Sequence, residues 1–284
     1  MAMDIQPFES TLGALVTGIA LADLDQSKWL QIESAFLEHA VLIFPGQYLS
    51  NEQQACFAIR FGEMDQLGSG KDAIPLCNQR ADGSLRKKDE HLMQILRGNE
   101  GWHTDGSYMS LAAKVSMLSA HVVPSTGGET EWADARAGYD VLSSDTQDRI
   151  SDLAAQHSLT YAQAKIGHKA KAGASYGLHE EEAPLRPLVK VHPITGRRGL
   201  VTGRHAFGIP GLEEEESGKL IEELLDSTCQ PQHTHRHSWQ VGDIAVWDNR
   251  AVLHRARPYN IEEPRLMYHT RIAGDPGSEL SIAR

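Results

Sequence analysis

The sequence has few cysteines and no long apolar segment. Its three cysteines, Cys56, Cys77 and Cys229, are scattered and odd in number, which argues against a disulfide framework or a cysteine-based zinc site and fits a reducing cytosol. No apolar run approaches the roughly 18 residues of a transmembrane helix. The N-terminus also lacks the basic stretch followed by an apolar one that marks a secretory signal. The sequence therefore predicts a cytoplasmic protein without a membrane partner.

Basic residues are also fewer than acidic ones. The chain carries 27 lysines and arginines against 38 aspartates and glutamates, a formal net charge of −11. This balance argues against nucleic acid or an anionic membrane as a partner, but not against a small anion, because one buried arginine is enough to bind it locally. With 284 residues, 40% of them hydrophobic and 23% charged, and with no repeat or linker, the chain is expected to form one soluble domain over residues 1–284.

Hydrophobic periodicity predicts a mainly β protein with helical decoration. Helical spacing of apolar residues is found over 23–40, 50–61, 135–142, 145–156 and 213–229. Short apolar or alternating segments predict strands over 12–21, 41–44, 115–123, 129–133, 158–161, 188–192, 198–203, 233–240, 244–248, 251–256 and 265–273. The strands do not alternate regularly with helices, which favours a jelly-roll-like core. Segments 63–101 and 163–184 show no periodicity and are candidates for loops that cover a binding site.

A histidine and an aspartate stand two residues apart in Trp102-His103-Thr104-Asp105-Gly106. In an extended segment such residues point to the same face, so His103 and Asp105 reach one point. An imidazole and a carboxylate that converge on one atom form two thirds of the 2-His-1-carboxylate arrangement of non-haem Fe(II) sites. The same spacing recurs in His179-Glu180-Glu181, which we interpret as a chance pair. The first pair needs a further histidine from elsewhere.

Two segments compete to supply this third ligand. In the run from His233 to His237, three histidines alternate along one strand face. Neighbouring imidazoles could share a metal, but all three on one ion would be strained, and an exposed edge strand is the simpler interpretation. His254 instead lies on a predicted core strand, eleven residues before Arg265. A hairpin centred on Tyr259 and Asn260 would place Arg265 opposite His254. A buried guanidinium there needs an anion, and a carboxylate matches its geometry best.

Several segments in fixed order resemble the taurine and 2,4-dichlorophenoxyacetate dioxygenases, which are Fe(II)/2-oxoglutarate enzymes. The likeness spans nearly the whole chain through LGALVTGIAL, HAVLIFPGQYLSNEQQ, GWHTDGSYM, TGGETEWAD, SWQVGDIAVWDNRAVLHRA and PRLMYHTRIAGD. It implies a double-stranded β-helix (jelly-roll) core in which His103, Asp105 and His254 bind the iron. It also implies that Arg265 pairs with the distal carboxylate of 2-oxoglutarate and that Thr130 hydrogen-bonds it.

Within this family the chain is most similar to the aryloxyalkanoate (phenoxypropionate herbicide) dioxygenases, through SLTYAQAKIGH, APLRPLVKVHPITGR and GRHAFGIPG. Arg204 and His205 supply a cation and a donor suited to a substrate carboxylate. Asn99 is a further substrate candidate. So is His269, which stands where the taurine enzyme has a second arginine, four residues after the one that binds 2-oxoglutarate. Candidate apolar walls are Met109, Phe207 and Ile209.

The expected activity is hydroxylation of a small amphipathic carboxylate, with consumption of O2 and 2-oxoglutarate and release of succinate and CO2. The substrate is expected to be aryloxyalkanoate-like, and the protein to be a homo-oligomer. Three alternatives stay open. They are hydroxylation or desaturation of another carboxylate or a sulfonate, zinc-dependent hydrolysis at the same His/Asp/His set, and non-catalytic sensing of 2-oxoglutarate. In a hydrolase, Arg265 and Thr130 would have no obvious anion to bind.

Overall fold

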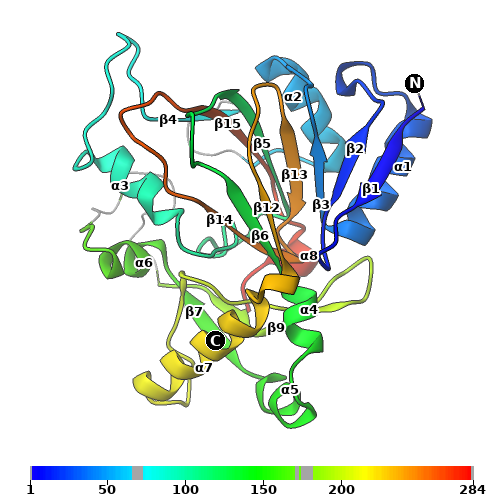
Figure 1. Ribbon diagram of the computed structural model, residues 1–284. Coiled ribbons are helices and arrows are strands. Elements are labelled where there is room, and N and C mark those ends of the chain that lie inside the picture. Colours follow the sequence, from blue (N-terminus) through cyan, green and yellow to red (C-terminus); the bar gives the residue numbers. More distant parts are fainter. Residues whose placement is uncertain (1, 66–72, 170–172, 174–181, 283–284) are drawn as a thin grey trace.

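Two β-sheets that face each other form the centre of the molecule (Figure 1). The computed structural model describes residues 2–65, 73–169, 173 and 182–282. Within these ranges the larger sheet has the order β1 (Asp4–Pro7), β2 (Ala14–Thr17), β3 (Val41–Phe44), β13 (Ile244–Asp248), β5 (Val115–Val122), β15 (Leu266–Ile272) and β4 (Ile74–Cys77). The smaller sheet has the order β12 (Thr234–His237), β6 (Thr130–Asp134) and β14 (Val252–Ala256). The prediction of a mainly β protein with helical decoration is confirmed.

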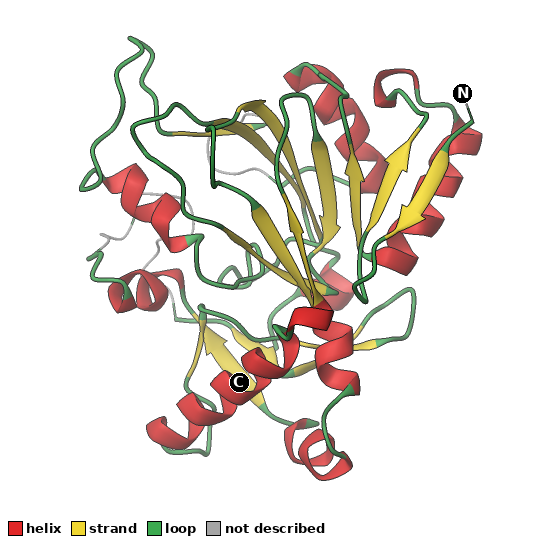
Figure 2. Ribbon diagram, in the orientation of Figure 1, coloured by secondary structure: helices red, strands yellow, loops and turns green. Residues whose placement is uncertain are grey.

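Two helices cover the outer face of the larger sheet (Figure 2). Helix α1 (Gln26–His39) is followed directly by β3, because the chain reverses at Ala40 in a left-handed conformation with φ of 62°. Helix α2 (Asn51–Ala58) begins at a capping box. In it, Ser50 Oγ accepts from Gln53 N at 3.2 Å and Gln53 Oε1 accepts from Ser50 N at 2.9 Å. This box satisfies backbone donors at the helix start, and the motif is visible in the sequence alone.

Strand β13 shows how the sheet separates two apolar layers. Ile244 and Val246 pack outward against the cluster under α1 and α2, whereas Ala245 and Trp247 point inward, as the two-residue period of a strand requires. Trp247 meets Trp132 of β6 across the space between the sheets, with ring centroids 5.8 Å apart. The two sheets therefore hold a shared core at this point.

Further elements lie below the sheets in Figure 1. Strand β7 (Ala154–His157) pairs with β8 (Leu185–Pro187) and β11 (Ala206–Phe207), and β9 (Val189–Val191) pairs with β10 (Arg198–Leu200) as predicted. The remaining helices and short helical turns here and elsewhere are η1 (Leu21–Asp23), η2 (Ile59–Phe61), α4 (Ala135–Asp140), α5 (Ser144–Ile150), α7 (Glu214–Thr228), η3 (Pro231–His233) and α8 (Pro276–Glu279). Among the described residues, none of the helices combines the length and the apolar composition needed to cross a membrane.

The two segments without periodicity contain regular structure. Segment 63–101 includes β4 and helix α3 (His91–Gly98), and α6 (Leu159–Lys165) runs into segment 163–184. The strand predicted over 158–161 is wrong, because Ser158 Oγ accepts from Tyr161 N and caps α6. The helix predicted over 145–156 ends at Ile150, since 154–157 pairs as β7. His179, Glu181 and the rest of 174–181 lie outside the described residues.

The predicted hairpin between His254 and Arg265 is also wrong. Strand β14 pairs with β6 in the smaller sheet, where His254 lies opposite Trp132. Strand β15 pairs with β5 and β4 in the larger sheet. The turn around Tyr259 therefore carries the chain from one sheet to the other, and the symmetry of a hairpin does not apply to it.

A buried charge cluster ties the lower elements to the end of β13. Asp248 Oδ2 lies 3.0 Å from His192 Nε2 and accepts from Arg250 Nη2 at 2.7 Å. His192 Nδ1 in turn accepts from the backbone nitrogens of Ile194 and Thr195 in the β9–β10 turn. Burial alone would raise the pKa of Asp248, but these partners hold that pKa well below its ordinary value.

The carboxylate of Asp248 should therefore stabilise the fold. Asp248→Asn breaks a buried pair, and we expect it to lower the free energy of unfolding at pH 7 by about 3 kcal/mol. A lowered pKa in the folded state contributes stability above the unfolded pKa of about 3.9, so the wild type should lose this contribution as the pH falls below that value. Denaturant unfolding at pH 7, 5 and 3 measures both effects. The exposed Asp152→Asn is the control, and equal stability of the two variants at pH 7 would contradict the prediction.

Candidate active site

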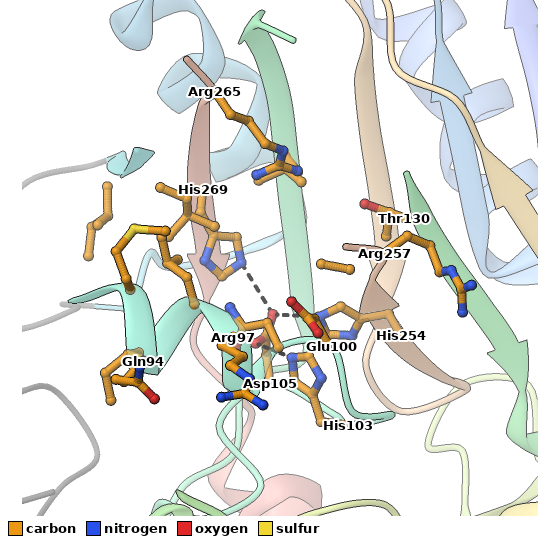
Figure 3. Close-up of a pocket in the computed structure, with 18 of the residues that line it drawn as sticks. Gln94, Arg97, Glu100, His103, Asp105, Thr130, His254, Arg257, Arg265 and His269 are labelled. Carbon is orange, nitrogen blue, oxygen red and sulfur yellow. Dashed lines mark ion pairs between the residues drawn. The ribbon is translucent and has the colours of Figure 1, made fainter. Parts of the chain in front are cut away.

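A cavity of about 580 Å³ lies between the two sheets. Its walls include His103, Asp105, His254, Thr130 and Arg265. Figure 3 shows these side chains around one space, although they come from a loop, from two strands of the smaller sheet and from the residue just before β15 of the larger sheet. The fold thus brings together all five residues for which the sequence predicted a role toward a metal or a keto acid.

The three predicted metal ligands converge. His103, Asp105 and His254 each offer a ligand atom within 4.8 Å of the others, and they are the metal-binding cluster found among the described residues. The backbone sets this geometry. His103 N donates to His254 O at 2.9 Å and His254 N donates to His103 O at 2.8 Å, so the His-x-Asp segment pairs as an isolated bridge with β14.

A chain of hydrogen bonds orients the carboxylate. Ser116 Oγ donates to Asp105 Oδ2 at 2.7 Å, Asn249 Nδ2 donates to Ser116 Oγ at 2.8 Å, and Trp247 Nε1 donates to Asn249 Oδ1 at 3.1 Å. All four residues are buried. Sequence reasoning missed Ser116 and Asn249, because hydrogen bonds between strands that are distant in sequence leave no local pattern.

The imidazoles are in the form that binds a metal. Gly101 O lies 2.8 Å from His103 Nδ1, and a proton on that nitrogen leaves the Nε2 lone pair toward Asp105. Burial lowers the pKa of His103 to about 4 and holds that of His254 well below its usual range. Burial would raise the pKa of Asp105, but His254 and His269 hold it well below the ordinary value. Two neutral imidazoles and one carboxylate with room for further ligands fit Fe(II).

Arg265 and Thr130 form a second group of donors. Arg265 is 8% exposed. Its Nη2 donates to Gly128 O at 3.3 Å and its guanidinium lies over the Tyr259 ring, but no acidic side chain in the described ranges pairs with it. Thr130 Oγ1 accepts from Trp239 Nε1 at 3.0 Å, which leaves the hydroxyl proton to be donated. A buried cation beside a hydroxyl donor fits a carboxylate group, such as the distal one of 2-oxoglutarate.

Arg186 fixes the loop that follows the metal ligands. Its guanidinium donates to the backbone carbonyls of Ser107, Met109 and Ser110, and also to Glu279 O at 2.7 Å. Burial lowers the pKa of Arg186 to about 10. This role could not be predicted from the sequence, since a single arginine in the segment APLRPLVKVH has no distinctive spacing.

Three of the four predicted substrate residues line the cavity. These are Asn99, His205 and His269. His269 Nε2 lies 3.2 Å from Asp105 Oδ2, and its ring is parallel to that of Trp247 at 6.2 Å. The second arginine of the taurine enzyme is thus replaced here by an imidazole that contacts a predicted metal ligand. His205 is buried against Tyr108, with Ser107 Oγ 3.1 Å from its Nδ1.

Arg204 is not on the cavity wall. The residues that line the cavity include Asn99 and Glu100, but not Arg204. The apolar walls predicted from sequence are also wrong, because Met109, Phe207 and Ile209 are all absent from the described residues that line the cavity. Phe207 stacks on Tyr161, and Ile209 belongs to the core around α7. The described lining instead draws its apolar residues from the larger sheet, α3 and α6, among them Ile74, Leu76, Met93, Ile95, Leu118 and Leu159.

The histidines at 233–237 do not form a site. His233 Nδ1 lies 3.0 Å from Ser227 O, His235 stacks on Phe8, and His237 Nε2 lies 3.0 Å from Asp243 Oδ2. Strand β12 is an edge of the smaller sheet, as the sequence predicted. Each imidazole has its own protein partner, so the run is a structural feature.

Comparison with known proteins identifies relatives along the whole chain. The chain is 49% identical over 288 residues to an (S)-phenoxypropionate/alpha-ketoglutarate-dioxygenase of Sphingobium herbicidovorans, covering 99% of both chains. It is 36% identical over 279 residues to an alpha-ketoglutarate-dependent 2,4-dichlorophenoxyacetate dioxygenase of Cupriavidus pinatubonensis, covering 93% of this chain and 96% of the relative. The crystal structure of AAD-2 in complex with Mn(II) and N-oxalylglycine superposes with a TM-score of 0.91 at 33% identity, covering 100% of both chains.

The family model described as taurine catabolism dioxygenase TauD, TfdA family matches residues 4–271. This range includes every residue discussed for the metal and the keto acid. The match agrees with the resemblance carried by the sequence motifs. The chain therefore belongs to the TauD/TfdA family of dioxygenases.

Proposed function

We propose that the protein is an Fe(II)- and 2-oxoglutarate-dependent dioxygenase that hydroxylates a small amphipathic carboxylate of the aryloxyalkanoate class. One observation carries the proposal. A His/Asp/His set and a buried arginine without an acidic partner among the described residues face the same cavity. A metal site alone would explain the first feature but not the second. Relatives named as phenoxypropionate and 2,4-dichlorophenoxyacetate dioxygenases support the cosubstrate and the substrate class.

In the proposed site, His103 and His254 bind iron through Nε2 and Asp105 binds it through a carboxylate oxygen. Arg265 and Thr130 hold the distal carboxylate of 2-oxoglutarate, which orients the keto acid toward the metal. When bound, iron with 2-oxoglutarate and O2 supplies the oxidation, in which one oxygen atom enters succinate as CO2 leaves and the other enters a substrate C–H bond. The protein contributes positioning and the exclusion of water.

An aryloxyalkanoate would be cleaved by this hydroxylation. A hydroxyl group on the carbon beside the ether oxygen gives a hemiketal-type product, which collapses to a phenol and an oxo acid without a further oxidant. The substrate residues that we propose on the cavity wall are Asn99, His205 and His269. Arg204 acts on the site from behind this wall, in contrast to the direct contact that the sequence predicted.

We also propose that the two facing sheets form a double-stranded β-helix and that residues 1–284 form a single domain. The proposal rests on the two sheets around one cavity, in which every described strand pair except the parallel pair β2–β3 is antiparallel, and on family membership. A homo-oligomer in the cytoplasm remains the expectation from sequence. Sedimentation velocity of the purified protein would measure the oligomeric state.

Succinate release from a substrate panel tests the function. The panel contains phenoxyacetate, both enantiomers of phenoxypropionate, and taurine, each with Fe(II), 2-oxoglutarate and O2. We expect succinate and phenol in equal amounts from at least one aryloxy acid. Taurine should give little, because His269 replaces the second arginine of the taurine enzyme. If the iron-loaded protein binds 2-oxoglutarate but forms no phenol from any of them, the aryloxyalkanoate class is excluded.

The metal ligands can be tested one at a time. His103→Ala, Asp105→Ala and His254→Ala should each abolish iron-dependent turnover and lower the bound iron measured after desalting, while circular dichroism shows an intact fold. His237→Ala is the matched control, since His237 pairs with Asp243 at an edge strand. Full iron content in His254→Ala, or loss of iron in His237→Ala, would mean that a residue other than His254 is the third ligand.

The cosubstrate site predicts a selective defect. Arg265→Ala should weaken the binding of 2-oxoglutarate by about 2–5 kcal/mol, which is the typical cost of removing one partner of a buried charge pair. Thr130→Val should weaken the binding of 2-oxoglutarate by about 1 kcal/mol, because one neutral hydrogen-bond donor is removed. Arg265→Lys should recover part of the loss, since it keeps the charge but not the two-pronged geometry. The KM for 2-oxoglutarate measures all three, and an unchanged KM in Arg265→Ala would place the anion elsewhere.

A further inference from the structure

We infer that Arg97, at the end of α3, binds the carboxylate of the organic substrate, and that Arg204 supports α3 from behind. This inference rests on the proposed function and names the group that recognises the substrate. Neither the family motifs nor the sequence spacing points to Arg97, because it lies in the segment without periodicity before the His-x-Asp motif.

The backbone holds the end of α3 next to the proposed iron ligands. Asn99 O accepts from Ala256 N at 2.8 Å, and His103 exchanges two hydrogen bonds with His254 on the same strand. Arg97 is two residues from the first of these contacts, and it lines the cavity. Figure 3 shows it at the end of α3 that is nearer to the predicted metal ligands. A carboxylate bound there would lie close to the reacting centre.

The other cations on the wall are committed. Arg265 is assigned to 2-oxoglutarate. Arg271 Nη2 lies 3.0 Å from Asp65 Oδ2, and Arg257 Nε lies 3.8 Å from Glu131 Oε1. Lys88 precedes α3 and so lies at the opposite end from Arg97 of a helix about 12 Å long. Arg97 is exposed and has no ion pair in the described ranges, although Glu100 attracts it electrostatically. Arg204 Nη1 and Nη2 also lack a hydrogen-bond partner among the described residues, but Arg204 does not line the cavity. Of the lining cations that have no other assignment, Arg97 is the one beside the predicted metal ligands.

The same helix supplies an apolar surface beside Arg97. Met93 and Ile95 line the cavity with Leu159 and Tyr108, and Ile95 packs against a small cluster formed by Tyr108 and Leu159. An aryloxyalkanoate has an aromatic ring at one end and a carboxylate at the other. A helix with apolar side chains and one arginine facing the same cavity matches this pattern.

Arg204 packs under the end of α3 instead of reaching the cavity. A Cβ at Gly98 would lie 2.6 Å from Arg204 Nη1 and 2.5 Å from Gln163 Nε2, and one at Gly101 would lie 3.0 Å from Arg204 Cδ. A side chain at Gly98 would displace the guanidinium, and one at Gly101 would press on the aliphatic part of Arg204. Arg204 N also donates to Trp102 O at 2.8 Å. A guanidinium beneath the last turn of a helix is favourable, because the carbonyl end of the helix is negative.

Binding of an acid and its neutral analogue tests the assignment. Isothermal titration calorimetry under anaerobic conditions, with Fe(II) and 2-oxoglutarate present, compares phenoxyacetate with phenoxyacetamide. Arg97→Gln should lower the affinity for phenoxyacetate by roughly 10- to 100-fold, as expected when a hydrogen bond to a charged group is lost. The affinity for phenoxyacetamide and for 2-oxoglutarate should stay the same. Arg97→Lys should retain most of the preference for the acid.

Two further variants separate this assignment from its alternatives. Arg149→Gln removes a surface arginine paired with Glu216. It should change the affinity for neither phenoxyacetate nor phenoxyacetamide. Arg204→Gln should lower the unfolding temperature and reduce the affinities for phenoxyacetate and phenoxyacetamide by the same factor. An unchanged preference for the acid in Arg97→Gln, or its loss in Arg204→Gln alone, would overturn the inference. Absence of phenol formation by the wild type would instead count against the proposed function, because the binding experiment does not require turnover.

Discussion

The candidate site depends on the two backbone hydrogen bonds between His103 and His254. They attach an irregular loop to the edge of a regular sheet, and this contact brings the two imidazoles to a centroid distance of 4.2 Å. Two protonated rings would repel each other at that distance. Burial also disfavours the charged form, so the site contains neutral imidazoles and one carboxylate. A divalent cation complements this arrangement, and its binding would add to the stability of the folded state.

The charge of the cavity is opposite to that of the whole protein. The chain has a net charge of −11, yet four arginines and a lysine line the cavity, against the carboxylates of Glu100 and Asp105. Clefts lined by one sign of charge concentrate ligands of the opposite sign. Both proposed organic ligands, 2-oxoglutarate and an aryloxyalkanoate, are anions. The overall charge therefore disfavours large polyanionic partners, while the local field still favours small anionic ones.

Local signals in the sequence predict much of this structure. The Ser50–Gln53 capping box and the strand at Val41–Phe44 are defined by neighbouring residues, and so is the pair His103 and Asp105. Contacts between distant segments are different. The hairpin rule failed at Arg265 because it assumes that consecutive strands share a sheet, whereas β14 and β15 lie in different sheets.

The position of Arg204 could not be predicted from sequence for a related reason. Its side chain is directed by contact with Gly98 and Gly101, more than 100 residues earlier. A glycine in a segment without periodicity suggests a turn, and nothing in its neighbourhood indicates which side chain will pack on it. Ser116 and Arg186 were missed in the same way, since their hydrogen-bond partners lie in separate loops or in α8.

Strand β14 links metal binding to substrate recognition. His254 is a proposed iron ligand, and Ala256, two residues later, holds the end of α3 through Asn99. In the proposed site, a short piece of one hydrogen-bonded strand would therefore set the distance between the metal and the substrate anion. Catalysis by positioning requires the reacting atoms to be held closely, and a regular strand varies less in geometry than a loop.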